Sequence, residues 1–226
     1  MERIAIVVAG GSGQRAGGGV PKQFRLLDGK PVLLHCLETL HRAGATRLVV
    51  VLHPDYLDEW RERLAALSYP VVAVAGGASR PESVRNALCE IRRQGYANDD
   101  LIAIHDGARP LLPLQVARDG WVMGADEGAA IPVVPATDSL RVLTDGDASE
   151  AVDRSRYRCV QTPQVFRAHI LMDAYSRPGL ERFTDDASAV EAAGYSVVLF
   201  PGHPHNIKIT NPGDLEIAEV LLRLMK

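Results

Sequence analysis

The stretch Arg3-Ile-Ala-Ile-Val-Val-Ala9, followed by Gly10-Gly-Ser-Gly-Gln-Arg-Ala-Gly-Gly-Gly-Val-Pro-Lys-Gln23, decides the fold prediction for this chain. The apolar run predicts a buried first strand, and glycines let backbone N–H groups come close to an anion because they carry no side chain. Arg15 and Lys22 add positive charge to the loop. A strand that ends in such a loop is typical of a polyphosphate site, since the cations stabilise charge that develops during phosphorus chemistry.

Three other interpretations of the loop are possible. Gly11-Ser-Gly-Gln-Arg-Ala16 matches the letters of a dinucleotide fingerprint, but that motif starts a helix within the loop and has an acidic residue about 20 positions on. Here Gly17-Gly-Gly-Val-Pro21 interrupts any helix, and the second strand ends in His53-Pro54. A P-loop needs Ser or Thr after its lysine, where this chain has Gln23. A plain glycine turn stays open, but an irregular loop around a nucleoside triphosphate explains Arg15 and Lys22 better.

The rest of the chain alternates strand and helix patterns, which predicts a mainly parallel sheet covered by helices on both faces. We therefore expect an α/β fold with a doubly wound, Rossmann-like sheet in one domain over residues 1–226. Strands are expected at 47–52, 71–75, 101–105, 129–134 and 196–200, and helices at 31–43, 55–67, 81–95, 114–125, 168–175, 185–193 and after Asn211 or Asp214.

The alternation stops at Asp138-Ser-Leu-Arg-Val-Leu-Thr144. With the turn at 145–147 and the segment 151–160, this stretch predicts a two-stranded antiparallel ribbon that protrudes as an arm over residues 137–160. An isolated hairpin is marginally stable in water. Because this one carries little apolar surface, we expect it to pack on a second subunit and to form a homodimer.

Composition excludes several classes of protein. The chain has 226 residues, is 46% hydrophobic and 23% charged, and carries a net charge of −3, which is ordinary for a globular protein and gives no basis for a nucleic-acid surface. No apolar run is long enough for a bilayer crossing, and the N-terminus lacks a signal-peptide pattern. The three cysteines, Cys36, Cys89 and Cys159, form no Cys-x-x-Cys pair. We expect reduced thiols, no zinc site and a cytoplasmic location.

Polar residues follow two further strands. Asp106-Gly-Ala-Arg-Pro110 follows the strand expected at 101–105, and doubly wound sheets bind ligands at such strand ends. Asp106 either holds a substrate hydroxyl or a metal, or it caps a turn and pairs with Arg109. His105 is expected to be a packed strand residue. After 71–75, Ser79 and Glu82 have the spacing of a capping box, which leaves Arg80 to reach a ligand. In Asn206-Ile-Lys-Ile-Thr210, alternation places Lys208 on the polar face of a strand.

Seven segments, in this order, resemble one family, that of the 2-C-methyl-D-erythritol 4-phosphate cytidylyltransferases. They are Ala9-Gly-Gly-Ser-Gly-Gln-Arg15, Pro21-Lys-Gln23, His105-Asp-Gly-Ala-Arg-Pro110, Val152-Asp-Arg154, Thr162-Pro-Gln164, Thr184-Asp-Asp-Ala-Ser188 and Asn206-Ile-Lys-Ile-Thr210. The resemblance implies a transferase of the non-mevalonate isoprenoid pathway, in which methylerythritol phosphate attacks the α-phosphorus of CTP and releases pyrophosphate. It also implies Mg²⁺, held mainly by the CTP phosphates with Asp106 as a candidate ligand.

The resemblance assigns roles to individual positions. The catalytic residues it implies are Arg15, Lys22, Arg154 and Lys208; the nucleotide contacts are Ala9, Gly10, Gly11, Gly13, Gly77, Arg80 and Ser83; the contacts to the second substrate are Asp106, Gly107, Arg109, Ser139 and Thr162. Ser139 and Arg154, on the arm, would serve the neighbouring subunit's site. Gly107 stands where the family usually has Ala, which is expected to loosen the turn, and Ser139 and Arg141 replace a usual Thr and Lys.

Two alternatives remain at this point. A sibling cytidylyltransferase could use another polyol phosphate, such as ribitol 5-phosphate, because the glycine loop sees only the nucleotide. A non-catalytic nucleotide-binding module is more remote, because Arg15, Lys22 and Lys208 are all present. No nucleic-acid or membrane partner is expected.

Overall fold

Strand β1 (Arg3–Ala9) lies inside an eight-stranded sheet of the computed structural model, which describes residues 1–11, 19–144, 146 and 148–225. It pairs in parallel with β4 (Arg47–Leu52) on one side and with β6 (Leu101–Asp106) on the other. Strand β5 (Val71–Ala75) extends the sheet beyond β4. The order β5-β4-β1-β6 makes the chain reverse its winding beside β1, and ligands of such sheets bind at the carboxyl ends of the strands there.

The other half of the sheet is mixed. Strand β11 (Gln164–Arg167) runs antiparallel to β6 and to β7 (Ala129–Pro135), while β12 (Val198–Pro201) pairs in parallel with β7. The mainly parallel α/β sheet predicted from the sequence is thus confirmed. Strand β11 was not predicted, because Thr162-Pro-Gln164 resembles a turn and hides the start of the strand.

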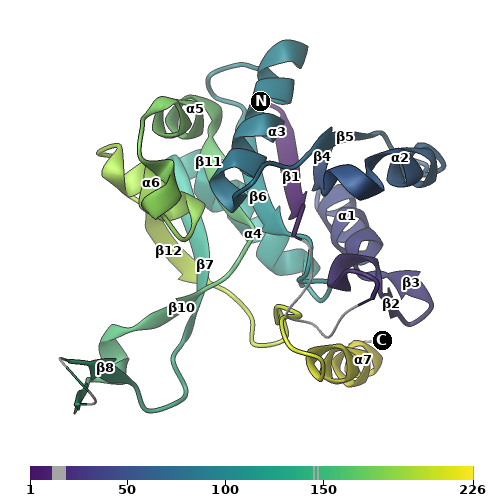
Figure 1. Cartoon of the computed structure of the whole chain (residues 1–226). Helices are drawn as coiled ribbons and strands as arrows, with labels where there is room; N and C mark the ends of the chain where they lie inside the picture. Colours follow the sequence, from purple (N-terminus) through teal and green to yellow (C-terminus); the bar gives the residue numbers. More distant parts are fainter. Residues whose placement is uncertain (12–18, 145, 147, 226) are drawn as a thin grey trace.

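Helices cover both faces of the sheet (Figure 1). One face carries α1 (Val32–Arg42), α2 (Leu57–Ala65) and α4 (Leu114–Glu127), whose buried residues include Trp60 and Trp121. The other face carries α3 (Arg80–Gln94), α5 (Ala168–Ser176) and α6 (Asp186–Ala192), packed around Phe166. Each large side chain that is fully buried contributes roughly 2–3 kcal/mol, so these two layers hold the strand ends in place.

Helix α7 (Asp214–Leu224) packs beside the carboxyl ends of the strands, against the small hairpin β2 (Leu26–Leu27) and β3 (Lys30–Pro31). No helix in the described part of the chain has both the length and the apolar character that a bilayer crossing requires. The three thiols are free, with Cys36 buried and Cys89 and Cys159 exposed.

The hairpin β8 (Arg141–Leu143) and β9 (Ser149–Ala151) stands away from the sheet and its helices (Figure 1). The predicted second strand over 151–160 was wrong. Its last part, β10 (Arg158–Val160), pairs with β7 in the main sheet. The sequence misled because the segment is almost wholly exposed on both faces, so no apolar alternation specifies its register.

Candidate active site

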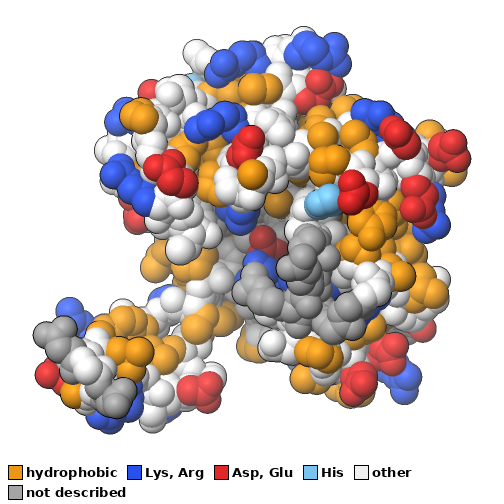
Figure 2. All heavy atoms as spheres, viewed as in Figure 1, with side chains coloured by type: hydrophobic (Ala, Val, Ile, Leu, Met, Phe, Trp, Pro, Cys, Tyr) orange, Lys and Arg blue, Asp and Glu red, His pale blue; other side chains and the backbone are white. Residues whose placement is uncertain are grey.

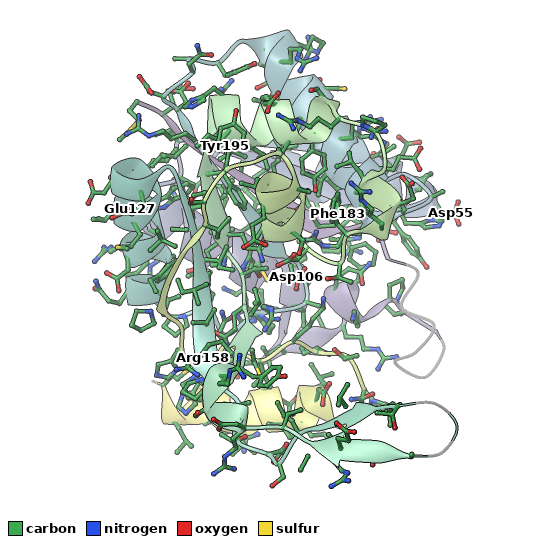
Figure 3. The ribbon with its side chains drawn as sticks, turned by 90° about the vertical axis from the view of Figure 1, so that its left-hand side faces the viewer. Asp55, Asp106, Glu127, Arg158, Phe183 and Tyr195 are labelled. Atoms are coloured by element: carbon green, nitrogen blue, oxygen red, sulfur yellow. The ribbon has the colours of Figure 1, made fainter. Side chains whose placement is uncertain are left out.

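A pocket of about 490 Å³ opens at the carboxyl ends of β1, β5 and β6, where the winding of the sheet reverses. Figure 2 shows acidic and basic side chains together in the hollow on this face, and Figure 3 places Asp106 in the middle of the molecule, far from Asp55 and Glu127 at its outer sides. The residues that line the pocket are Val8, Ala9, Gly10, Gly11, Lys22, Gln23, His53, Gly77, Ala78, Ser79, Arg80, Ser83, Asp106, Gly107, Ala108 and Lys208.

Lys22 is placed by its neighbour Gln23, a buried side chain that sequence reasoning did not single out. The Gln23 Nε2 donates to the carbonyl oxygens of Ala9 (2.8 Å) and Gly11 (2.9 Å). The next residue, Phe24, stacks on Trp60 with ring centroids 4.5 Å apart. These contacts fix the short 3-10 turn that carries Lys22 against the end of β1. Two other predicted residues, Arg15 and Gly13, lie outside the described residues.

Asp106, at the end of β6, is surrounded by three cations. Its Oδ2 lies 3.0 Å from Lys208 Nζ and 3.3 Å from Arg109 Nε, and its Oδ1 lies 3.8 Å from Arg80 Nε. Burial favours the protonated form of Asp106, but the charges of Lys208, Arg80 and Arg109 outweigh it and hold the pKa of the carboxyl well below its usual range. The pocket therefore contains a permanent carboxylate whose charged neighbours are all basic.

Arg80 is held by a buried carboxylate, whereas the sequence pattern left it without a protein partner. Its two terminal nitrogens form a bidentate pair with the fully buried Asp186, at 3.0 and 2.6 Å. The hydroxyl of Tyr175 donates to the same carboxylate at 2.5 Å. Burial lowers the pKa of the Arg80 guanidinium, but Asp186 and then Asp106 raise it above its usual value, so Arg80 stays charged. Arg80 still lines the pocket, as a cation whose direction the buried pair fixes.

A second layer of hydrogen bonds supports Asp106 from behind. The backbone N–H of Asp106 donates to Thr162 Oγ1 at 3.0 Å. The Thr162 hydroxyl donates to His105 Nδ1 at 3.0 Å, because the neutral ring must keep its proton on Nε2, which faces a carbonyl oxygen. His105 Nε2–H then donates to the carbonyl of Arg109 at 3.2 Å. Full burial lowers the pKa of His105 to about 4, consistent with this neutral tautomer and with its prediction as a packed residue.

Thr162 belongs to this layer and lies behind Asp106. The sequence resemblance placed Thr162 against the second substrate. In the structure its hydroxyl is used by the protein, its side chain is buried, and it is not among the pocket-lining residues. In this structure the Thr162 hydroxyl supports the end of β6.

Arg109 and the segment 206–210 place Lys208. The Arg109 Nη1 donates to the Asn206 carbonyl at 2.8 Å, and the N–H of Ile209 donates to the Ala108 carbonyl at 2.8 Å. Lys208 is held between these two anchors and points to Asp106. The predicted strand at 206–210 is absent, because these backbone groups bond to the loop after β6 and not to a sheet edge. Arg109 itself does not line the pocket.

The loop after β5 forms the opposite wall. Ser79 caps α3 by accepting from the N–H of Glu82 (3.2 Å), as predicted, while Glu82 reaches back to the N–H of Ala78 (2.8 Å). The Ser83 hydroxyl accepts from the N–H of Gly77 at 3.1 Å. A Cβ on Gly77 would lie 2.3 Å from Glu82 Cγ, so this wall requires glycine.

Gly107 tightens its turn, contrary to the expectation that it loosens it. Its N–H donates to the Val8 carbonyl at 2.9 Å, and a Cβ there would lie 2.9 Å from the Cβ of Ala9. Glycine at this position thus lets the loop after β6 lie directly on the end of β1.

The two arm residues lie apart from this chain's own pocket. Ser139 and Arg154 are exposed, neither lines the pocket, and Arg154 Nη1 donates to the Thr137 carbonyl within the arm. The described residues hold no cluster of three or more His, Cys, Asp or Glu side chains of the kind that binds a metal by itself. Asp106 is the one carboxylate among the described residues that line the pocket.

Comparison with known proteins agrees with this geometry. The family model described as 2-C-methyl-D-erythritol 4-phosphate cytidylyltransferase matches residues 3–224. Proteins of that name from Bacteroides thetaiotaomicron and Porphyromonas gingivalis (strain W83) are 41% and 43% identical, covering 98% of this chain and 100% and 98% of theirs.

Solved structures give the same result. A crystal structure of 4-diphosphocytidyl-2C-methyl-D-erythritol synthase superposes with a TM-score of 0.81 at 32% identity, covering 98% of each chain. The cytidylyltransferase from Thermus thermophilus superposes with a TM-score of 0.75 at 31% identity, covering 99% of this chain and all of the other. With its fold, its strand-end pocket and its full-length similarity, this chain belongs to the 2-C-methyl-D-erythritol 4-phosphate cytidylyltransferase family.

Proposed function

We propose that the pocket at the ends of β1, β5 and β6 carries out the family's reaction, transfer of CMP from CTP to 2-C-methyl-D-erythritol 4-phosphate in isoprenoid biosynthesis. The observation that supports this site most is the convergence of Lys22, Lys208 and Arg80 at the switch point of the sheet, around a single ionised carboxylate. Family membership decides between the two polyol phosphates that the sequence left open, in favour of methylerythritol phosphate.

The reaction needs alignment and positive charge more than it needs a base. An oxygen of the acceptor's phosphate forms a bond to the α-phosphorus of CTP, the bond from that phosphorus to the bridging oxygen breaks, and pyrophosphate leaves. The attacking phosphate is already deprotonated near neutral pH. Lys22, with Arg15 from the glycine loop, would stabilise the charge that develops at phosphorus, and Lys208 would hold the attacking phosphate. Asp106 would in turn orient Lys208, 3.0 Å away.

The nucleotide would lie between two loops. The backbone at Ala9, Gly10 and Gly11 would face the triphosphate, because these three residues line a cationic pocket. The sequence resemblance adds Gly13 to this group. Gly77 and Ser83 on the opposite wall would contact the cytidine side, with Arg80 held below them. Gly107 would shape the floor of the pocket near the second substrate, and Arg109, which does not line the pocket, would act there by placing Lys208.

A divalent cation such as Mg²⁺ fits this donor set when CTP is bound. Mg²⁺ commonly takes one or two carboxylates and completes its shell with substrate phosphates and water. Asp106 supplies one ionised carboxylate facing the pocket, and the triphosphate would supply the other ligands. When bound, the ion neutralises charge on the phosphates.

We infer that the arm over residues 137–160 joins two chains into a homodimer. The arm exposes Val142, Leu143, Tyr157 and Val160, with Leu143 82% accessible, and a hairpin of this size lacks a core of its own. Ser139 and Arg154, which do not reach this chain's pocket, would then complete the partner's pocket. The arm would then be an extension of a single domain over 1–226. Separately, the free thiols favour a reducing, cytoplasmic setting.

A substrate panel tests the proposal. The purified protein is incubated with CTP, Mg²⁺ and either 2-C-methyl-D-erythritol 4-phosphate or ribitol 5-phosphate, and pyrophosphate release is followed. We expect release with methylerythritol phosphate and little with ribitol phosphate. Turnover with ribitol phosphate alone would overturn the substrate assignment, and CTP binding without any turnover would favour the non-catalytic alternative.

A further inference from the structure

Helices α3 and α5 cover the same face of the sheet (Figure 1), and a second cavity is lined by residues of both helices and of the segment after α5. It has a volume of about 530 Å³ and shares no lining residue with the substrate pocket. Its lining is Arg85, Leu88, Cys89, Arg92, Met172, Tyr175, Ser176, Arg177 and Pro178. Three of these nine residues are arginines, and none is acidic.

The three arginines converge because of helix geometry. Arg85 and Arg92 are seven residues apart on α3, two turns of the helix, so both face the same way. Arg177 enters from the end of α5. Such a concentration of positive charge is local, since the chain as a whole carries a net charge of −3.

Arg85 and Arg92 are not neutralised by the protein. Within the described parts of the chain, neither forms an ion pair with a carboxylate, although Arg93, next to Arg92, is bound to Glu90 at 2.8 and 2.6 Å. Arg92 makes only a long contact, 4.0 Å from its Nη2 to the sulfur of Met172. Arg177 is bound to Asp173 at 2.8 Å, outside the lining. Two guanidinium groups thus remain available to an anion.

The rest of the lining is apolar. Leu88 and Met172 are buried side chains of the lining, and Tyr175 and Pro178 complete the wall. Ser176 adds a hydroxyl. Guanidinium groups match the geometry of phosphate oxygens and bind them with paired hydrogen bonds. An apolar lining suits the carbon skeleton of a small ligand.

We propose that this cavity is a binding site for a small phosphate monoester with an apolar body, separate from the substrate pocket. The phosphate lies against Arg85 and Arg92, and the apolar part lies on Leu88 and Met172. Tyr175, which lines the cavity, also donates its hydroxyl to Asp186, the partner of Arg80. One side chain therefore contacts both the ligand and the network that positions a cation of the substrate pocket.

Cys89 provides a local reporter, because it lines the cavity and its thiol is exposed. The full-length protein is alkylated with iodoacetamide with or without phenyl phosphate, and each cysteine is quantified by mass spectrometry. At ten times its dissociation constant, measured by calorimetry, phenyl phosphate should slow alkylation of Cys89 roughly tenfold, because only the empty fraction reacts. Cys159, exposed on β10, serves as the internal control and should not change.

Two variants decide whether the arginines bind the phosphate. Arg85→Ala combined with Arg92→Ala should abolish protection of Cys89, whereas Arg93→Ala, on the same helix but outside the lining, should keep it. Phenol, which has the ring without the phosphate, should protect little. Equal protection by phenol, or undiminished protection in the double variant, would overturn the proposal. The readout does not depend on turnover, so its failure is distinct from failure of the proposed function.

Discussion

The buried histidine behind the active site makes a pH prediction that can be worked out from the structure. His105 is fully buried, its ring nitrogens are both hydrogen-bonded, and its pKa is lowered from 6.5 to about 4, mainly by burial. The unfolded chain therefore takes up a proton near pH 6.5, whereas the folded protein resists one until about pH 4. Stability from this group is present above pH 6.5 and is lost as the pH falls toward 4.

The size of the effect follows from the two pKa values. Between pH 7 and pH 5, linkage of protonation to folding predicts a loss of about 2 kcal/mol in the free energy of unfolding from His105 alone. His105→Gln removes the titrating group and keeps a donor toward the Arg109 carbonyl. We expect this variant to be less stable at pH 7 and to lose less stability between pH 7 and pH 5, by about that amount.

Urea denaturation followed by circular dichroism, at about pH 7, 6 and 5, measures both quantities. His169→Gln is the matched control, because His169 is exposed, and it should show the pH dependence of the wild type. If wild type and His105→Gln lose stability in parallel over this range, the lowered pKa of the buried His105 is wrong.

Three further predictions concern the site and the arm. Asp186→Asn leaves the buried charge of Arg80 without its bidentate partner and should lower the free energy of unfolding, measured by urea denaturation, by roughly 3 kcal/mol or more. Asp173→Asn, in an exposed pair, should lower it by under about 1 kcal/mol. Equal losses would contradict the role of burial. Lys22→Ala should weaken CTP binding, measured by calorimetry, only modestly but should lower turnover at least about 100-fold. The control Lys30→Ala, outside the pocket, should leave turnover unchanged. A fully active Lys22→Ala would refute the role assigned to Lys22. Leu143→Asp on the arm should shift the sedimentation coefficient at micromolar concentration from dimer toward monomer, and a variant that stays dimeric would show that the arm does not join the subunits.

Local patterns predicted most of the sheet and many of its helices. Strands β1, β4 and β5 have the predicted bounds, because each is a short apolar run closed by polar or glycine residues. A short hairpin lies within the range predicted for the arm, but its second strand is not the predicted one, since exposed strands carry no alternation that specifies register. Strand β11 was missed because Thr162-Pro-Gln164 resembles a turn locally.

The site shows the same division. Lys22 and Asp106 could be proposed from the sequence pattern, because glycines beside cations and polar residues after buried strands are visible in it, whereas Lys208 was proposed only from the family resemblance. That Thr162 supports Asp106 could not, since the two residues are 56 positions apart and meet only because β11 pairs with β6. Gln23 carried a weak signal at best, an amide directly after a lysine.

The sequence by itself determined that this chain builds a mainly parallel sheet, because strand burial is a property of neighbouring residues, and it predicted a phosphate-binding loop after the first strand from the glycines and cations there. Only the tertiary structure decided which charges meet. Arg80 and Asp186 are 106 positions apart, and their pairing depends on α3 and α6 lying on the same face of the sheet. The residues next to a charged side chain on a helix do not reveal its ion-pair partner. The packing of distant elements buries the side chain against that partner and fixes its direction in the pocket.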